Sequence, residues 1–255
     1  MNTDITEKPW HIIRTDTYST KYYKLEDALF YFLREHHNSK PINDIDAFSN
    51  FWCLALVNIK ENHAAISRKG KLNFHSGSLC IFCPPFSLVN WHINPGEIKW
   101  HGFISDRILP DTLPKTPILF PWNKTIPKSY NEIINIIKST IHYTEIDKIE
   151  EPSGIAFKTK KFIDNHFTED LSISDISNAL KISHPVMTRL FKKSFSLSPL
   201  EYRNKLRIFE AQKLFLITPC KIDKTRRATG FKDQTSFYRN FKQNTLVSPK
   251  VFSQS

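Results

Sequence analysis

The sequence has little cysteine and little glycine, and each shortage excludes a class of protein. Four cysteines, Cys53, Cys80, Cys83 and Cys220, are too few and too scattered among 255 residues for a disulfide framework. Only six glycines are present, and they form no phosphate-binding loop. No apolar run approaches the length of a membrane span, and the first ten residues, MNTDITEKPW, contain no signal core. We therefore expect a cytoplasmic protein that does not bind membranes.

The histidines and cysteines also lack a metal-binding pattern. Among the histidines of the N-terminal half, the candidates for metal ligands are His63, His75, His92 and His101. They include no His-x-His pair, and no nearby Glu completes a facial set of ligands. Cys80 and Cys83 form a single Cys-x-x-Cys, whose side chains would face opposite ways in a strand. We expect no metal, no cofactor and no enzymatic activity, while a metal-dependent cupin enzyme and redox sensing by these two thiols stay open as alternatives.

All the excess positive charge lies in the last hundred residues. Residues 155–255 contain 19 Lys/Arg and 8 Asp/Glu, a difference equal to the net charge of +11 for the whole chain, and residues 1–154 contain 17 of each. This asymmetry predicts two domains, the second of which binds a polyanion. The charged segment 148–154, KIEEPSG, is the expected linker between a domain over 1–147 and a domain over 155–255.

The first domain is expected to be rich in β-structure. Residues 1–47 fit either a helix or extended segments, whereas short apolar runs punctuated by Gly, Pro and Asn follow from Phe48. These runs are typical of a small antiparallel barrel or sandwich. A helix is predicted over 130–146, with an apolar stripe at Ile133, Ile134, Ile137 and Ile141. We expect this stripe to pack on the barrel, with a dimer face as the alternative.

The second domain reads as helical throughout, and residues 172–193 form its most informative stretch. The pattern predicts a short helix with Ile176 inward, then a second helix with Ser183 as N-cap and Pro185 in its first turn. Phe191 points inward, whereas Arg189 lies on a basic outer face. A short helix, a turn and a second helix with such a face are typical of a helix-turn-helix unit, although an ordinary helical hairpin would give the same local pattern.

A repeat inside the second domain favours the helix-turn-helix interpretation. Phe191-Lys192 and Ser198-Pro199 recur fifty residues later as Phe241-Lys242 and Ser248-Pro249. Arg189 matches Arg239 at the same offset. Two tandem units, over about 172–193 and 222–242, would present two recognition helices about one DNA turn apart.

With these motifs, residues 158–252 resemble the DNA-binding domain of the AraC/XylS family of bacterial transcription regulators. The residues that carry the resemblance extend through both units: Ile176, Ala179, Ser183, Arg189, Phe191, Lys192, Ser198, Pro199, Tyr202, Arg207, Ala211, Leu214, Gly230, Phe231, Asp233, Phe237, Arg239, Phe241, Lys242, Ser248, Pro249 and Phe252. The resemblance implies a seven-helix domain that binds double-stranded DNA in adjacent major grooves and an activator that contacts RNA polymerase.

The resemblance also assigns contacts to individual residues. Base contacts would come from Pro185, Thr188, Arg189, Gln234, Thr235, Tyr238 and Arg239. Arg to guanine and Gln to adenine are the natural pairings in the major groove. Phosphate contacts would come from Lys192, Lys193, Lys232 and Lys242. These lysines would supply affinity and salt dependence without sequence information.

The second unit departs from the family pattern. Thr225 and Arg226 stand where the family has a large apolar residue and an alanine, and a buried unpaired arginine would be expensive. The glycine expected before each Ser-Pro is replaced by Ser196 and Leu246. We therefore predict that the first unit carries most of the sequence specificity.

The first domain resembles the cupin-like sensor barrel of this family in its pattern of short apolar runs and in their order. The fold class is thus predicted as α+β, with an antiparallel β-barrel followed by an all-α domain with two helix-turn-helix units. The barrel would bind a small-molecule effector and form a homodimer. Aromatic residues that could line its pocket, or be plain core, are Phe51, Trp52, Phe82, Phe86, Trp91 and Trp100. The alternative function is a ligand-binding or redox-sensing barrel with a tail that binds nucleic acid non-specifically.

Overall fold

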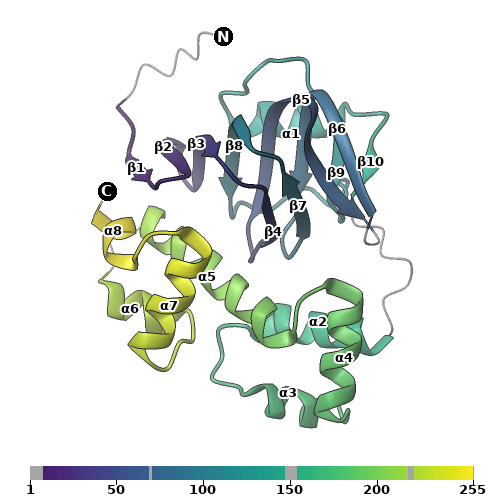
Figure 1. Ribbon diagram of the computed structural model, residues 1–255, viewed down its shortest axis with the longest axis vertical. Coiled ribbons are helices and arrows are strands. Elements are labelled where there is room, and N and C mark those ends of the chain that lie inside the picture. Colours follow the sequence, from purple (N-terminus) through teal and green to yellow (C-terminus); the bar gives the residue numbers. More distant parts are fainter. Residues whose placement is uncertain (1–7, 69–70, 147–153, 218–220, 255) are drawn as a thin grey trace. The chain divides into compact units, whose positions relative to one another are not determined.

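The computed structural model describes residues 8–68, 71–146, 154–217 and 221–254. The chain divides into two compact units, Met1–Lys148 and Ile149–Gln254, the first built mainly of strands and the second of helices (Figure 1). The predicted linker lies outside the described residues apart from Gly154. Within the described residues, no helix combines the length and the apolar character that a membrane crossing requires.

The described residues of the first unit form ten strands and one helix. The strands are β1 His11–Arg14, β2 Tyr18–Glu26, β3 Leu29–Asn38, β4 Ile42–Ala47, β5 Trp52–Arg68, β6 Lys71–Cys83, β7 Leu88–Ile93, β8 Gly96–Ser105, β9 Ile118–Pro121 and β10 Thr144–Glu145. Residues 1–47, for which the sequence left helix or extended structure open, therefore contribute strands β1 to β4. Consecutive aromatic residues, Tyr22 and Tyr23 in β2 and Phe30 to Phe32 in β3, place rings on both faces of the sheet.

The strands form one antiparallel sheet that does not close into the predicted barrel. The order is β1-β2-β3-β8-β5-β6-β9-β10, and β4 joins through β7, which also pairs with β5. The long strand β5 shifts register between Ile59 and Ala64, so that its first half pairs with β8 and its second half with β7. The sheet branches at β5, which pairs with β6, β7 and β8, and no pairing among the described strands links β1 to β10.

One face of the sheet packs against helix α1, Tyr130–Lys138. Ile133, Ile134 and Ile137 are buried in a core that includes Trp52 and Phe82, which confirms that the predicted stripe packs on the sheet. The helix is shorter than predicted. It ends at Ser139, β10 follows, and Ile141 is 85% exposed, so the prediction of a helix over 130–146 was wrong at its C-terminal end.

The second unit consists of seven helices in its described residues. They are α2 Gly154–His166, α3 Ile173–Ala179, α4 His184–Phe195, α5 Pro199–Ile217, α6 Ile222–Ala228, α7 Gln234–Thr245 and α8 Pro249–Gln254. We call α3 with α4 the first helix pair and α6 with α7 the second. The long helix α5 lies between the pairs in sequence and contributes Tyr202, Leu206 and Ala211 to the core.

The sequence repeat is also a repeat of structure. Helices α4 and α7 each contain 12 residues, and each is followed by a left-handed residue, Ser196 at φ 60° and Leu246 at φ 62°. The order of buried, half-buried and exposed positions over 184–200 is identical to that over 234–250. Equivalent positions therefore lie in equivalent environments.

Candidate nucleic-acid interface

Helix α4 presents a polar, basic outer face. Ser183 occupies the N-cap position with extended backbone, although its hydroxyl makes no capping hydrogen bond, and Pro185 lies in the first turn. Met187, Phe191 and Phe195 are buried and hold the helix on the core. Met187 was not expected to be buried, although its spacing of four residues from Phe191 was the available signal.

Helix α7 has the same construction with a stronger N-cap. The side chain of Asp233 accepts a hydrogen bond of 2.6 Å from the backbone N–H of Ser236. Phe237, Phe241 and Thr245 fill the buried positions that Met187, Phe191 and Phe195 fill in α4. Neither α4 nor α7 contains an acidic residue, so both outer faces suit a polyanion.

The predicted base-contacting residues fall on these two outer faces. Arg189 and Arg239 are exposed at equivalent positions, and Thr188 and Tyr238 are half-buried beside them. The remaining three residues, Pro185, Gln234 and Thr235, lie in the first turns of these helices and are exposed. The structure thus gathers these residues into two similar clusters, one on each helix.

The predicted phosphate-binding lysines are all exposed, but they differ in their partners. Lys192, Lys193 and Lys242 lie in the last turns of α4 and α7. Lys232 precedes α7, and its Nζ lies 2.8 Å from an Asp170 carboxylate oxygen. A surface pair of this kind contributes little to stability, yet it competes with a phosphate for the same ammonium group.

The first helices of the two pairs differ more than the second helices do. Helix α3 begins with a capping box, in which Ser172 and Asp175 each accept a hydrogen bond from the other's backbone N–H. These hydrogen bonds lower the pKa of Asp175. Helix α6 has Lys221 at its N-cap position and no side-chain capping hydrogen bond. The entry into the second pair is therefore held less firmly.

Thr225 and Arg226 have different environments in α6. Thr225 is 1% exposed, and its buried hydroxyl has no hydrogen-bond partner among the described residues. Arg226 bonds an Asp223 carboxylate oxygen at 2.8 and 3.0 Å and donates to the carbonyl oxygens of Phe231 and Lys232. The arginine is therefore paired, and it ties the turn of the second pair to α6.

Two buried arginines of α5 hold the loop that precedes α3, although Arg207 was expected only as one of the residues that carry the family resemblance and no role was expected for Arg203. Arg203 donates to the carbonyl of Leu171. Arg207 donates to the carbonyls of Phe167, at 2.5 Å, and Glu169, at 2.8 Å. Burial, together with the charge of Arg203, lowers the pKa of Arg207 to about 10.

In the first unit, the six aromatic residues proposed for an effector pocket belong largely to the core. Phe51, Trp52, Phe82 and Trp100 are buried, whereas Phe86 and Trp91 are half-buried. They do not form one cluster. Trp52 and Phe82 pack toward α1. Trp91 contacts Trp100 edge to face, and its indole N–H donates a hydrogen bond of 2.9 Å to a carboxylate oxygen of Asp46.

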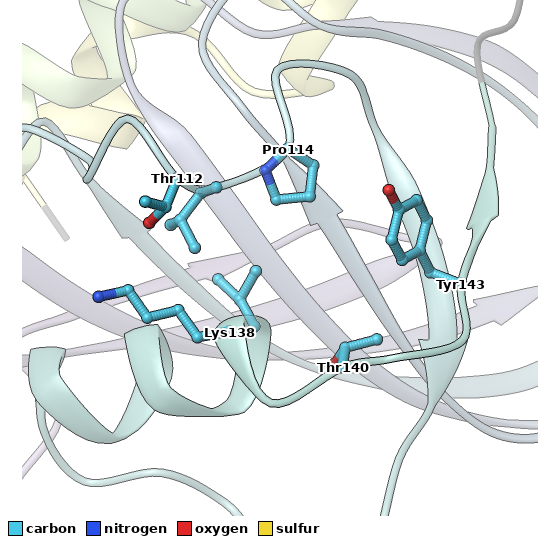
Figure 2. A pocket seen from close by; sticks show the side chains of 7 residues that line it. Thr112, Pro114, Lys138, Thr140 and Tyr143 are labelled. Carbon is cyan, nitrogen blue, oxygen red and sulfur yellow. The ribbon is translucent and has the colours of Figure 1, made fainter.

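A surface pocket of about 490 Å³ lies elsewhere in this unit, between the loop over 112–114 and the end of α1. Figure 2 shows Thr112, Pro114, Lys138, Thr140 and Tyr143 around it. A second pocket, of about 310 Å³, lies beside the same loop and is lined partly by Arg107 and Pro110. None of the six aromatic residues lines either pocket. The loop that lines both pockets has no apolar periodicity from which it could have been predicted.

The described histidines and cysteines form no cluster suited to a metal ion. Burial raises the pKa of Cys53 and Cys80 to about 12, which disfavours the reactive thiolate. His101 is hydrogen-bonded through Nδ1 to the hydroxyl of Tyr31 at 2.7 Å, and burial lowers its pKa to about 4. It serves as a neutral core residue.

Comparison with known proteins agrees with this geometry. Residues 176–255 match the model of a family described as "Helix-turn-helix domain". The lactose operon transcription activator of Staphylococcus xylosus is 29% identical over 91 residues, which cover 36% of this chain and 33% of that protein. The arabinose operon regulatory protein of Escherichia coli K12 is 30% identical over 93 residues, covering 36% and 32%. The chain thus spans about a third of the length of these two relatives.

The similarity to solved structures extends over both units. ToxT from Vibrio cholerae is 13% identical, with a TM-score of 0.51, and the match covers 93% of this chain and 99% of that one. At this identity the likeness concerns the fold: a sheet-rich N-terminal region followed by a helical C-terminal domain.

Proposed function

We propose that this chain is a sequence-specific transcription regulator of the AraC/XylS type that binds double-stranded DNA, because its C-terminal helices match a helix-turn-helix family and two operon regulators. Helices α4 and α7 act as recognition helices of two helix-turn-helix units in adjacent major grooves. The observation that carries the proposal is the repeated exposure of equivalent residues on two acid-free helices, with Arg189 and Arg239 at matching positions.

The two units divide affinity and specificity unequally. The capping box of Ser172 and Asp175 holds the first pair, whereas the second pair lacks a side-chain cap on α6 and buries the unpaired hydroxyl of Thr225. A helix pair that is held firmly at its entry loses less entropy when the side chains of its recognition helix dock on base edges. The first unit therefore carries most of the sequence discrimination, and Arg189 is its principal base contact.

A gel-shift comparison of Arg189→Ala with Arg239→Ala tests this division. The probe is a duplex selected by the full chain from a randomised pool, together with single-base variants of it. Arg189→Ala is expected to lose about 1–3 kcal/mol of discrimination at one position, and Arg239→Ala less. Equal losses would contradict the division. If neither variant changes discrimination, these arginines do not read bases.

The alternative of non-specific nucleic-acid binding by a basic tail makes a different prediction. Specific binding survives competitor DNA and moderate salt, whereas a purely electrostatic complex is lost steeply as salt rises. The selection itself is informative, because a non-specific binder enriches no sequence. Metal analysis of the purified chain tests the remaining alternative, a metal-dependent cupin enzyme.

The N-terminal unit serves as the regulatory part in this proposal. It binds a small-molecule effector and forms a homodimer, and the regulator activates transcription through contact with RNA polymerase. The relatives named as operon activator and operon regulatory protein support the part of this proposal that concerns transcription. Effector screening by thermal shift on the full chain, followed by sedimentation of the free protein, tests the two functions separately.

A further inference from the structure

The two helix pairs meet directly at the loop over residues 167–171. This loop follows α2 and leads into α3, so it forms the entry to the first pair. The turn over 229–232, which joins α6 to α7, lies against it. Gly230 has φ +80°, and a Cβ at this position would overlap the carbonyl oxygen of Thr168. The ion pair between Lys232 and Asp170 joins the same two segments at the surface.

Arg207 lies at the centre of this junction. Its guanidinium donates to the carbonyls of Phe167 and Glu169 on the loop, and its guanidinium carbon lies 5.5 Å from the centre of the Phe231 ring in the turn. The same side chain closes off the space beside Gly230, where a Cβ would come within 2.9 Å of Nη2. One side chain of α5 thus contacts the entry to the first pair and the turn of the second.

The turn leads straight into a recognition helix. Phe231 is three residues before Gln234, the first residue of α7, and the intervening Asp233 is the N-cap of that helix. A rotation of the turn on the loop would therefore carry α7 with it. A change of one base pair moves a DNA site by about 3.4 Å along the axis and by about a tenth of a helical turn, so small rotations of α7 matter.

We propose that Arg207 is a positioning residue that fixes the placement of α7 relative to α4 and thereby sets the number of base pairs between the two DNA segments that these helices bind. This inference rests on the proposed function. The residue touches no DNA in this arrangement, since it is 5% exposed. It acts on specificity through the turn that it holds.

The test compares spacing preference in the wild type and two Arg207 variants. The probe is the selected duplex, with versions in which one base pair is inserted or removed between the two protected segments. For the wild-type full chain, each change should lower affinity at least about tenfold, because both helices can no longer dock at once. With Arg207→Met, the three affinities should fall within about threefold of one another. Should Arg207→Met fail to fold, Arg207→Lys, which keeps the charge but not the paired donors, takes its place.

Arg203→Met is the matched control. Arg203 is a buried arginine one turn earlier on α5, and it donates to Leu171 at the far end of the same loop. It should keep the wild-type spacing preference even if its melting temperature falls. An Arg207 variant that folds and keeps the full spacing preference would overturn the proposal, and so would an Arg203 variant that loses the preference equally.

A measurement without DNA separates this inference from the proposed function. Spin labels at Lys193→Cys and Gln243→Cys, two exposed and equivalent positions, with Cys220 replaced by serine, report the distance between α4 and α7. The distance distribution should be narrow with Arg207 and Arg203→Met and broad with Arg207→Lys. A narrow distribution in all three chains contradicts the positioning role. A broadened distribution in a chain that selects no DNA sequence supports it while refuting the proposed function.

Discussion

Thr225 lies in the second helix pair where Ile176 lies in the first, and both are almost fully buried, at 1% and 2% exposure. The isoleucine fills its site with carbon, whereas the threonine places there a hydroxyl that finds no partner among the described residues. An unpaired buried hydroxyl costs about 1–3 kcal/mol. The two pairs thus share one backbone arrangement and differ in whether the residue buried at this site has an unpaired polar group.

Thr225→Val should therefore stabilise the second unit of the chain. The substitution keeps the branched shape and removes the unpaired hydroxyl, so the free energy of unfolding, followed by helical circular dichroism in urea, should rise by about 1 kcal/mol. Thr229→Val is the matched control. Its hydroxyl is buried but donates to the Thr225 and Arg226 carbonyls, so its loss should not stabilise. An equal gain from both variants would contradict this explanation.

Leu246→Gly should also stabilise the second pair. Leu246 has φ 62° and is 52% exposed, so it adopts a left-handed conformation without burying its side chain fully. This conformation costs a residue with a Cβ about 1–2 kcal/mol, and glycine avoids most of that cost. We expect a net gain of about 1 kcal/mol in unfolding free energy. Leu246→Ala keeps the Cβ and should show no such gain. If alanine matches glycine, then backbone strain is not the cause.

The stability of the first unit should fall between about pH 6.5 and pH 4 because of His101. Its folded pKa is lowered to about 4 by burial, so the unfolded chain binds a proton in this range that the folded chain does not. Stability from this group is complete above the unfolded pKa and is lost as pH falls. The neighbouring charges of Lys99 and Glu35 act in opposite directions.

His101→Gln should remove this loss of unfolding free energy, which is on the order of 3 kcal/mol over the pH range. All five tryptophans lie in residues 10–122, so tryptophan fluorescence during urea unfolding reports this unit. Burial also lowers the pKa of His36, to about 3, which means that a residual slope remains in the variant. A slope identical to that of the wild type would show that His101 does not titrate on unfolding.

The lysines should differ in their effect on DNA binding. Lys242→Ala is expected to weaken binding to all sequences alike and to reduce the slope of log affinity against log salt by about one. Lys232→Ala should reduce that slope by less, because Lys232 is paired with Asp170 in the free protein. Equal changes in slope would show that Lys232 leaves its carboxylate partner when DNA binds.

Much of the helical unit could be predicted from the sequence because its signals are local. Pro185, Pro199 and Pro249 mark the first turns of three helices, and the repeat of Phe191 at Phe241 fixed the second pair. The roles of Arg203 and Arg207 could not be predicted, since their partners are backbone carbonyls of a loop more than thirty residues away. No sequence pattern records such a contact.

The sequence predicted strands in the first unit but not how they are arranged in the sheet. Alternating runs indicated strands, but closure depends on which strand each edge meets, and pairings between strands far apart in the chain leave no local pattern in the sequence. The end of α1 at Ser139 was also missed. Ile141 continues the helical spacing, yet the chain leaves the helix to pair Thr144 with Leu119 of β9, a contact between distant residues.

The identical order of buried and exposed positions over 184–200 and 234–250 has a consequence for symmetry. A regulator that recognises DNA only through a two-fold dimer requires a palindrome, because both halves carry the same side chains. Here the two outer faces share their placement but not their chemistry, with Pro185 and Thr188 on one and Thr235 and Tyr238 on the other. A single chain built in this way suits a target whose two halves have unrelated sequences, read in one fixed direction along the duplex.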